Sequence, residues 1–136
     1  MRRLDRVAAP VICLGWAAAL ALPALQPAEG APLSGWILLT NGWRAADAGI
    51  WAWFANPLFL CSVGLLLAGW NRAARVLAGL ALLLGLSSLA AGPLAASAGY
   101  SIPDLSFRAG FWLWLMSLLA LCAWTWVAPS LKKKQW

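Results

Sequence analysis

Polar and aromatic side chains that could bind a ligand gather in one stretch of the sequence. The stretch contains Trp36, Asn41, Trp43, Arg44, Asp47, Trp51, Trp53 and Asn56. A guanidinium group among tryptophans could hold a lipid headgroup, the head of a quinone or an acidic side chain of a partner, because it offers a positive charge and several donors. Asp104 and Arg108 could face the same place from a later loop. We therefore define a candidate rim for a ligand or partner as Asn41, Trp43, Arg44, Asp47, Trp51, Trp53 and Asn56.

The same rim also has a simpler interpretation as solvated surface. Arg44 and Asp47 are three residues apart, so on a helical turn they would form an exposed ion pair worth about 0.2–0.5 kcal/mol. Tryptophan and arginine are moreover common wherever a protein meets the membrane surface. On the sequence alone we prefer this simpler interpretation. Loss of function on replacing Arg44 with Gln would favour a binding site instead.

The residue types that enzymes and metal sites need are scarce. The chain has no histidine, which excludes histidine-ligated haem, a Ser-His-Asp triad and the common zinc sites. Cys13, Cys61 and Cys122 lie in separate apolar stretches without the spacing of a metal or thiol redox motif, so we interpret them as packing residues. The sequence carries no glycine-rich phosphate loop and no dinucleotide fingerprint. We therefore expect no catalytic residue, no metal, no cofactor and no enzymatic activity.

The basic residues mark one side of a membrane. They stand at both ends of the chain and in one internal turn, as Arg2, Arg3, Arg6, Arg72, Arg75, Lys132, Lys133 and Lys134. They flank four long apolar stretches that contain no Asp, Glu, Lys or Arg. If these stretches cross a bilayer in alternation, only Arg44 and Arg108 lie on the opposite side. Because Lys and Arg accumulate in cytoplasmic loops, the pattern predicts that both termini face the cytoplasm.

The composition indicates the same class of protein. Of the 136 residues, 63% are hydrophobic and 10% are charged, so the chain has too little polar surface to cover its apolar residues in water. Its net charge of +6 fits the anionic lipids of a cytoplasmic leaflet. The basic residues form no stripe of the kind that binds nucleic acid, so nucleic acid is not an expected partner. The lack of ionisable residues inside the apolar stretches also argues against an ion-coupled transporter.

Four transmembrane helices would position these residues. A crossing needs about 20 apolar residues, and the sequence offers such stretches at residues 7–25, 50–70, 76–95 and 109–127. The predicted fold is an all-α integral membrane protein, a four-transmembrane-helix bundle that forms a single domain over residues 1–136. Residues 1–25 also match a cleaved signal peptide, which we favour less because the apolar run is longer than usual.

The first outer loop and the second helix carry further expectations. Residues 26–49 are predicted to lie outside the cytoplasm, with the apolar segment 33–43 either at the level of the lipid headgroups or folded over the helix ends as a lid. Asp47 is placed to cap a helix that starts near Ile50. Pro57 is expected to kink this helix, because a helix that began at Pro57 would be too short to cross the bilayer.

The third and fourth helices differ in the size of their side chains. Small residues recur in steps of three and four along the third helix, and such a seam lets helices approach closely in lipid. We define the small-residue seam as Ala74, Ala78, Ala81, Gly85, Ser88 and Gly92. Small residues are so frequent here that chance could also produce it. The fourth helix carries bulky residues from Phe111 to Trp126, and we expect it at the periphery or against a partner.

Two functions remain open on the sequence. The first is a noncatalytic accessory or assembly subunit of a larger membrane complex, which the small size and the lack of reactive groups favour. The second is a helical bundle that binds a hydrophobic ligand, such as a lipid or quinone, beneath the tryptophans and near Pro57. An immunity-type membrane protein also fits the size and the predicted topology, without a specific residue in its favour.

The expected location is the bacterial cytoplasmic (inner) membrane, which the chain would cross several times. The richness in Ala, Gly, Leu, Arg and Trp is typical of a GC-rich bacterium. The expected partners are the lipid bilayer and other membrane protein subunits.

Overall fold

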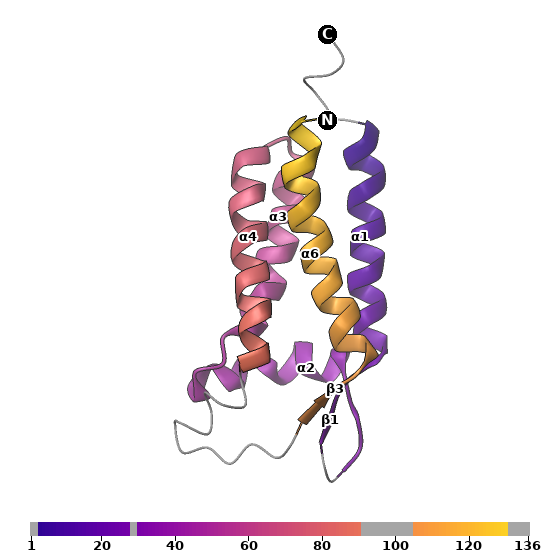
Figure 1. Ribbon diagram of the computed structural model, residues 1–136, viewed down its shortest axis with the longest axis vertical. Helices are drawn as coiled ribbons and strands as arrows, with labels where there is room; N and C mark the ends of the chain where they lie inside the picture. The colour runs from indigo at the N-terminus through magenta and orange to yellow at the C-terminus, as the bar shows by residue number, and fades with distance from the viewer. Residues whose placement is uncertain (1–2, 28–29, 91–104, 131–136) are drawn as a thin grey trace.

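Long helices run along the longest axis of the molecule (Figure 1). The structure, a computed structural model, describes residues 3–27, 30–90 and 105–130, and this part of the chain is mostly helical. The long helices are α1 (Arg3–Ala21), α3 (Ala55–Leu67), α4 (Asn71–Ser87) and α6 (Ala109–Ser130). Figure 1 shows that α1 and α4 begin, and α3 and α6 end, at the same end of the molecule. We call this end, which carries Arg6, Arg72 and Arg75, the basic end, and the opposite one, which carries residues 41–54, the rim end.

Three of the described helices are long and apolar enough to cross a membrane. Their apolar stretches are Leu4–Ala21, Asn71–Ala90 and Ala109–Val127. Large apolar side chains also stand exposed on the outside of these helices, among them Val7, Val11, Leu14, Val76, Leu83, Met116 and Val127. A soluble monomer rarely exposes so much continuous apolar surface. These are the features of a membrane protein.

The apolar stretch around α3 is shorter than the predicted second crossing. It runs over Ala52–Leu67, and its first residues form a 3-10 turn, η2 (Ala52–Phe54), before α3 begins at Ala55. Pro57 is therefore the third residue of α3, where a backbone N–H has no partner within the helix. The expected kink was wrong, because only two residues of α3 precede the proline and no longer helix is there to bend.

The expected cap at Asp47 is also absent. Asp47 lies inside a 3-10 helix, η1 (Gly42–Ala48), which ends at Gly49 in the left-handed conformation with φ of 76°. The residue at the N-cap position of α3 is Phe54, which makes no side-chain capping bond. The chain thus turns away at Gly49, so Asp47 cannot reach the start of α3.

A small antiparallel sheet at the rim end corrects the all-α prediction. Its strands are β1 (Pro23–Pro27), β2 (Leu33–Ser34) and β3 (Leu105–Phe107), in the order β2-β1-β3. Leu25 pairs with Phe107, and Gln26 pairs with Ser106. The first helix ends at Ala21, not near residue 25, since Pro23 cannot donate a helical hydrogen bond and the chain continues as β1.

The apolar segment of the first outer loop forms a short helix, α2 (Gly35–Asn41). The Ser34 side chain caps it by accepting a hydrogen bond from Ile37 N at 3.4 Å. Gly35 lies against the end of α1, where a Cβ atom would come within 2.5 Å of the Ala19 carbonyl oxygen. This close approach places the start of α2 against the rim end of α1, and Figure 1 shows α2 lying crosswise to the long helices at that end.

The buried face of α4 consists of small residues. Its buried members are Ala74, Ala78, Ala81 and Gly85, all of which belong to the small-residue seam. Ser62 of α3 donates a buried hydrogen bond to the Ala74 carbonyl oxygen at 2.7 Å. A Cβ atom added at Gly85 would lie 2.5 Å from Cδ1 of Leu118, a residue of α6. Ser88 is half-buried, and Gly92 lies outside the described residues.

Helix α6 is not peripheral, which corrects one of the two expectations for it; the other, that it faces a partner, stays a prediction. It packs against α1, α4 and β1. In its apolar stretch 39% of the residues are buried, against 17% in α1 and 22% in α4. Phe111, Leu118 and Leu121 point into the core, whereas Met116 stays exposed. Bulky side chains fill the space beside the small residues of α4, which is why an aromatic-rich helix can occupy the centre.

Candidate functional site

The polar members of the candidate rim do not converge on one point. Asn41 ends α2, and Arg44 and Asp47 lie in η1, with all three side chains exposed. The Asn41 side-chain amide donates hydrogen bonds to the Ile37 carbonyl oxygen at 3.2 Å and to Thr40 Oγ1 at 2.9 Å. It is therefore engaged with its own helix.

The rim tryptophans divide into exposed and inward-facing residues. Trp43 and Trp51 are each 54% exposed, as expected of indole rings at a membrane surface. Trp53 instead turns toward α2 and donates its indole N–H to the Leu39 carbonyl oxygen at 2.6 Å. A Cβ atom at Gly42 would lie only 2.9 Å from Trp53 Cδ1. Trp53 thus fixes η1 and α2 against η2.

Asn56 lies inside the bundle and not on the rim. Only 8% of its surface is exposed. Its side-chain oxygen accepts the indole N–H of Trp16 at 3.1 Å and that of Trp114 at 2.9 Å. Its amide nitrogen donates to the Trp53 carbonyl oxygen at 3.1 Å. We call Asn56, Trp16 and Trp114 the asparagine node, which joins α3, α1 and α6 near the rim end.

The remaining expected neighbour of the rim is Arg108. Its side chain is exposed, and its backbone N–H bonds to the Ala24 carbonyl oxygen of β1 at 2.9 Å. Asp104 lies outside the described residues. The structure therefore brings Trp53 and Asn56 together through a backbone contact, but leaves Arg44, Asp47 and Arg108 on the surface.

A second buried polar contact lies at the basic end, and the sequence reasoning missed it. Asp5 is only 4% exposed and accepts the indole N–H of Trp124 at 3.1 Å. This contact joins the start of α1 to the end of α6. The signal in the sequence was a lone carboxylate at the start of the first apolar stretch, with a tryptophan near the end of the last one. Asp5 precedes the predicted first crossing at residues 7–25, but α1 already begins at Arg3.

The other buried polar side chains also bond within the protein. Ser117 donates to the Leu113 carbonyl oxygen and Thr125 to the Cys122 carbonyl oxygen, each within the same helix. Across residues 3–27, 30–90 and 105–130, no buried side-chain nitrogen or oxygen lacks a hydrogen-bond partner. The interior polar groups therefore serve to join or stabilise helices in this part of the chain.

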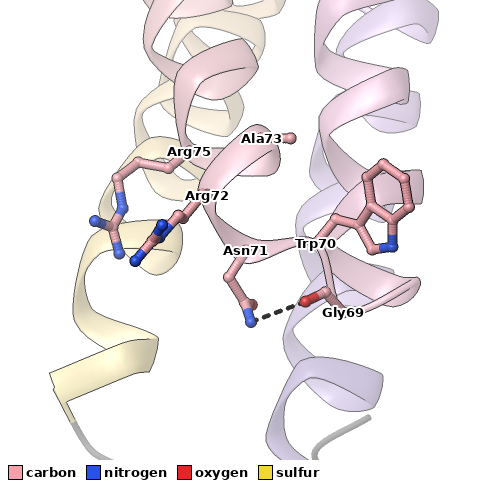
Figure 2. Close-up of a pocket in the computed structure, with 6 residues that line it drawn as sticks. All are labelled: Gly69, Trp70, Asn71, Arg72, Ala73 and Arg75. Atoms are coloured by element: carbon pink, nitrogen blue, oxygen red, sulfur yellow. Dashed lines mark hydrogen bonds between the residues drawn. The ribbon is translucent and has the colours of Figure 1, made fainter.

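A shallow pocket lies at the turn between α3 and α4. We call it the turn pocket, and Figure 2 shows its lining residues, Gly69, Trp70, Asn71, Arg72, Ala73 and Arg75. Arg75 Nε donates to the Thr125 carbonyl oxygen at 3.3 Å, and its guanidinium carbon lies 4.5 Å above the Trp126 ring. Arg72 is exposed and extends toward the same side as Arg75 in Figure 2. The pocket thus joins two cationic side chains at the basic end.

The cysteines occupy three helices, with Cys61 of α3 exposed and Cys13 of α1 and Cys122 of α6 half-buried. In the described residues, no group of three or more His, Cys, Asp or Glu side chains could hold a metal ion. The chain matches no family model, no curated protein and no solved structure.

Proposed function

We propose that this chain is a noncatalytic accessory or assembly subunit of a complex in the bacterial cytoplasmic membrane. The proposal rests on the buried polar side chains, all of which have hydrogen-bond partners within the described part of the protein. Asp5, Asn56 and Ser62 are buried, and each hydrogen-bonds to a residue of another helix. Buried polar groups that bond to each other stabilise a bundle and leave recognition to the outer surface.

The proposed topology is a multi-pass protein with both termini in the cytoplasm. Arg6, Arg72 and Arg75 lie at the same end of the molecule, where α1 begins, α3 gives way to α4 and α6 ends (Figure 1). A cytoplasmic excess of Arg and Lys is the main determinant of membrane orientation. This distribution supports the basic end as the cytoplasmic end.

The apolar stretch that contains α3, the second along the chain, can cross the bilayer only if the bilayer adapts to its short length. The apolar stretch Ala52–Leu67 is about 24 Å long at 1.5 Å per residue, against a hydrocarbon core of about 30 Å. A short span can be accommodated by local thinning of the bilayer and by interfacial side chains at its ends. Trp51 and Trp70 flank the stretch and are both exposed. They support a crossing whose ends lie in the interfacial layers.

The surface that would meet a partner is apolar. On α1, Leu4, Val7, Val11 and Leu14 repeat in steps of three and four and are all exposed. This spacing places them on one face of the helix. Such a face contacts either lipid or a helix of another subunit. The hypothesis of a hydrophobic ligand beneath the tryptophans has less support, because two indole groups already occupy the Asn56 side-chain oxygen.

Affinity purification of the full chain in mild detergent tests this proposal. We expect at least one other membrane protein to be recovered with it in a fixed ratio. Recovery only as a monomer or homodimer would contradict the proposal. Two matched variants locate the contact, Val11→Trp on α1 and Leu83→Trp on α4, because these side chains are similarly exposed, at 61% and 66%. The variant that reduces recovery of the partner identifies the face that contacts it.

A further inference from the structure

We propose that the turn pocket binds the phosphate group of an anionic glycerophospholipid. The pocket combines two arginines, Arg72 and Arg75, which extend to the same side of the turn, whereas the Trp70 indole points away from them (Figure 2). Arginine binds phosphate through two parallel N–H···O bonds, and a pair of arginines can hold one phosphate from two directions. The inference rests on the proposed membrane location of the chain.

Arg75 is already held in place without a ligand. Its Nε donates to the Thr125 carbonyl oxygen at 3.3 Å, and the Trp126 ring lies under the guanidinium group. This bond uses one of its five N–H groups and does not involve the two terminal nitrogens. A cation fixed by neighbouring groups loses less conformational entropy when it binds an anion.

The local charge of the pocket also favours an anion. Asp5, the acidic residue that the structure describes at the basic end, bonds to the Trp124 indole and not to either arginine. The N-cap position of α4 belongs to Trp70, whose side chain makes no capping bond. The backbone N–H groups in the first turn of α4 therefore add partial positive charge beside the two arginines.

The surface next to the pocket points to a lipid as the source of the phosphate. Val76 and Leu80 follow Arg72 at intervals of four residues on α4 and therefore lie on the same face of the helix. All three side chains are exposed, with Val76 at 61% and Leu80 at 45%. The charged Arg72 at the basic end is thus followed by an apolar stripe, Val76 and Leu80, toward the middle of the molecule. This arrangement fits a phospholipid, whose phosphate would bind the arginines while its acyl chain lies along the apolar stripe. Free phosphate has no apolar part that could contact the stripe.

Native mass spectrometry of the purified full chain tests the inference with defined lipids. The protein is titrated with phosphatidylglycerol and, separately, with zwitterionic phosphatidylcholine. We expect tighter binding of phosphatidylglycerol, and a loss of about fivefold in its affinity for Arg72→Gln and again for Arg75→Gln. Arg6→Gln is the matched control, because Arg6 is an exposed arginine at the same end that does not line the pocket. It should retain the affinity of the wild type.

Three outcomes of the lipid titration would overturn the inference. They are equal affinity for the two lipids, unchanged affinity in the Arg72→Gln, Arg75→Gln double variant, and an equal loss in Arg6→Gln. Inorganic phosphate is added as a competitor, and displacement of the lipid at equal concentration would assign the pocket to a soluble anion. Circular dichroism of each variant checks the fold, and the exposed Arg72 keeps the test informative if Arg75→Gln unfolds. Because the chain is tested alone, a failed search for a partner subunit leaves this result unaffected.

Discussion

The side-chain oxygen of Asn56 accepts the indole N–H of Trp114 at 2.9 Å, although the two residues are 58 positions apart in the sequence. The same oxygen accepts the indole N–H of Trp16 at 3.1 Å. One amide oxygen has two lone pairs, so these bonds use its full accepting capacity. The asparagine node therefore sets the relative positions of α1, α3 and α6 at one depth in the bundle.

Replacement of Asn56 by Leu should destabilise the fold. The substitution leaves the indole donors of Trp16 and Trp114 without their partner, and a buried unpaired donor costs about 1–3 kcal/mol. Hydrogen bonds between transmembrane helices average about 0.6 kcal/mol, so we expect a total loss near the lower end, about 1–2 kcal/mol. Unfolding in mixed micelles, followed by circular dichroism, measures it. Asn41→Leu is the control, because Asn41 is exposed and bonds only to nearby residues of its own helix. Equal stability of the two variants would contradict the role of the node.

The contact between α4 and α6 predicts different effects for two glycines of the same helix. An alanine Cβ at Gly85 would lie 2.5 Å from Leu118 Cδ1, whereas at Gly79 nothing lies within 4 Å. Added atoms in a tight contact cost about 1–3 kcal/mol, while alanine is favoured over glycine inside a helix by about 1 kcal/mol. We expect Gly79→Ala to be neutral or stabilising. The free energy of unfolding of Gly85→Ala should be lower than that of Gly79→Ala by about 1 kcal/mol or more. Thermal unfolding in detergent compares them. A Gly85→Ala variant as stable as Gly79→Ala would contradict the prediction that the Leu118 side chain is tightly held against Gly85.

The small-residue seam illustrates what the sequence could and could not predict. Side-chain size was a usable signal, since Ala74, Ala78, Ala81 and Gly85 are the residues that α4 buries. The position of α6 was not predictable in the same way. Nearly every face of α6 is apolar, so no contrast between polar and apolar residues distinguishes its buried face from its exposed face. Packing against the small residues of α4 decides that α6 lies at the centre.

The candidate rim was only partly predictable, because sequence proximity is a poor guide to direction in a short helical turn. Arg44 and Asp47 are exposed, as a solvated surface requires, but Asn56 faces the interior. The direction of Asn56 depends on Trp16 and Trp114, which come from helices distant in the sequence. The small sheet was missed for a similar reason. Strand β1 pairs with Leu105–Phe107, which lies about 80 residues away, so no local sequence pattern predicts the pairing.

A double-mutant cycle should detect the contact between Asp5 and Trp124. The bond of 3.1 Å joins the start of α1 to the end of α6. We expect Asp5→Ala and Trp124→Phe each to lower the free energy of unfolding, and the double variant to lose less than their sum, with a coupling of about 0.5–1.5 kcal/mol. Unfolding of the four proteins in mixed micelles provides the four free energies. The pair Asp47→Ala and Trp124→Phe serves as a control, because Asp47 lies at the rim end and should show additive losses. Additive losses for Asp5 and Trp124 as well would show that the bond contributes nothing.

Cysteine labelling should reveal whether the short α3 crosses the membrane. In a background without Cys13, Cys61 and Cys122, a single cysteine is introduced as Arg6→Cys, Asp47→Cys or Arg72→Cys, all at exposed positions. If α1 and α3 both cross, an impermeant maleimide labels Asp47→Cys in intact cells and labels the other two only after lysis. If α3 stays on the outer side, Arg72→Cys reacts together with Asp47→Cys, and the proposed fourfold crossing is wrong. Labelling of Arg6→Cys in intact cells would instead reverse the proposed orientation. The positive-inside rule favours the first result, because that topology places Arg6, Arg72 and Arg75 all in the cytoplasm.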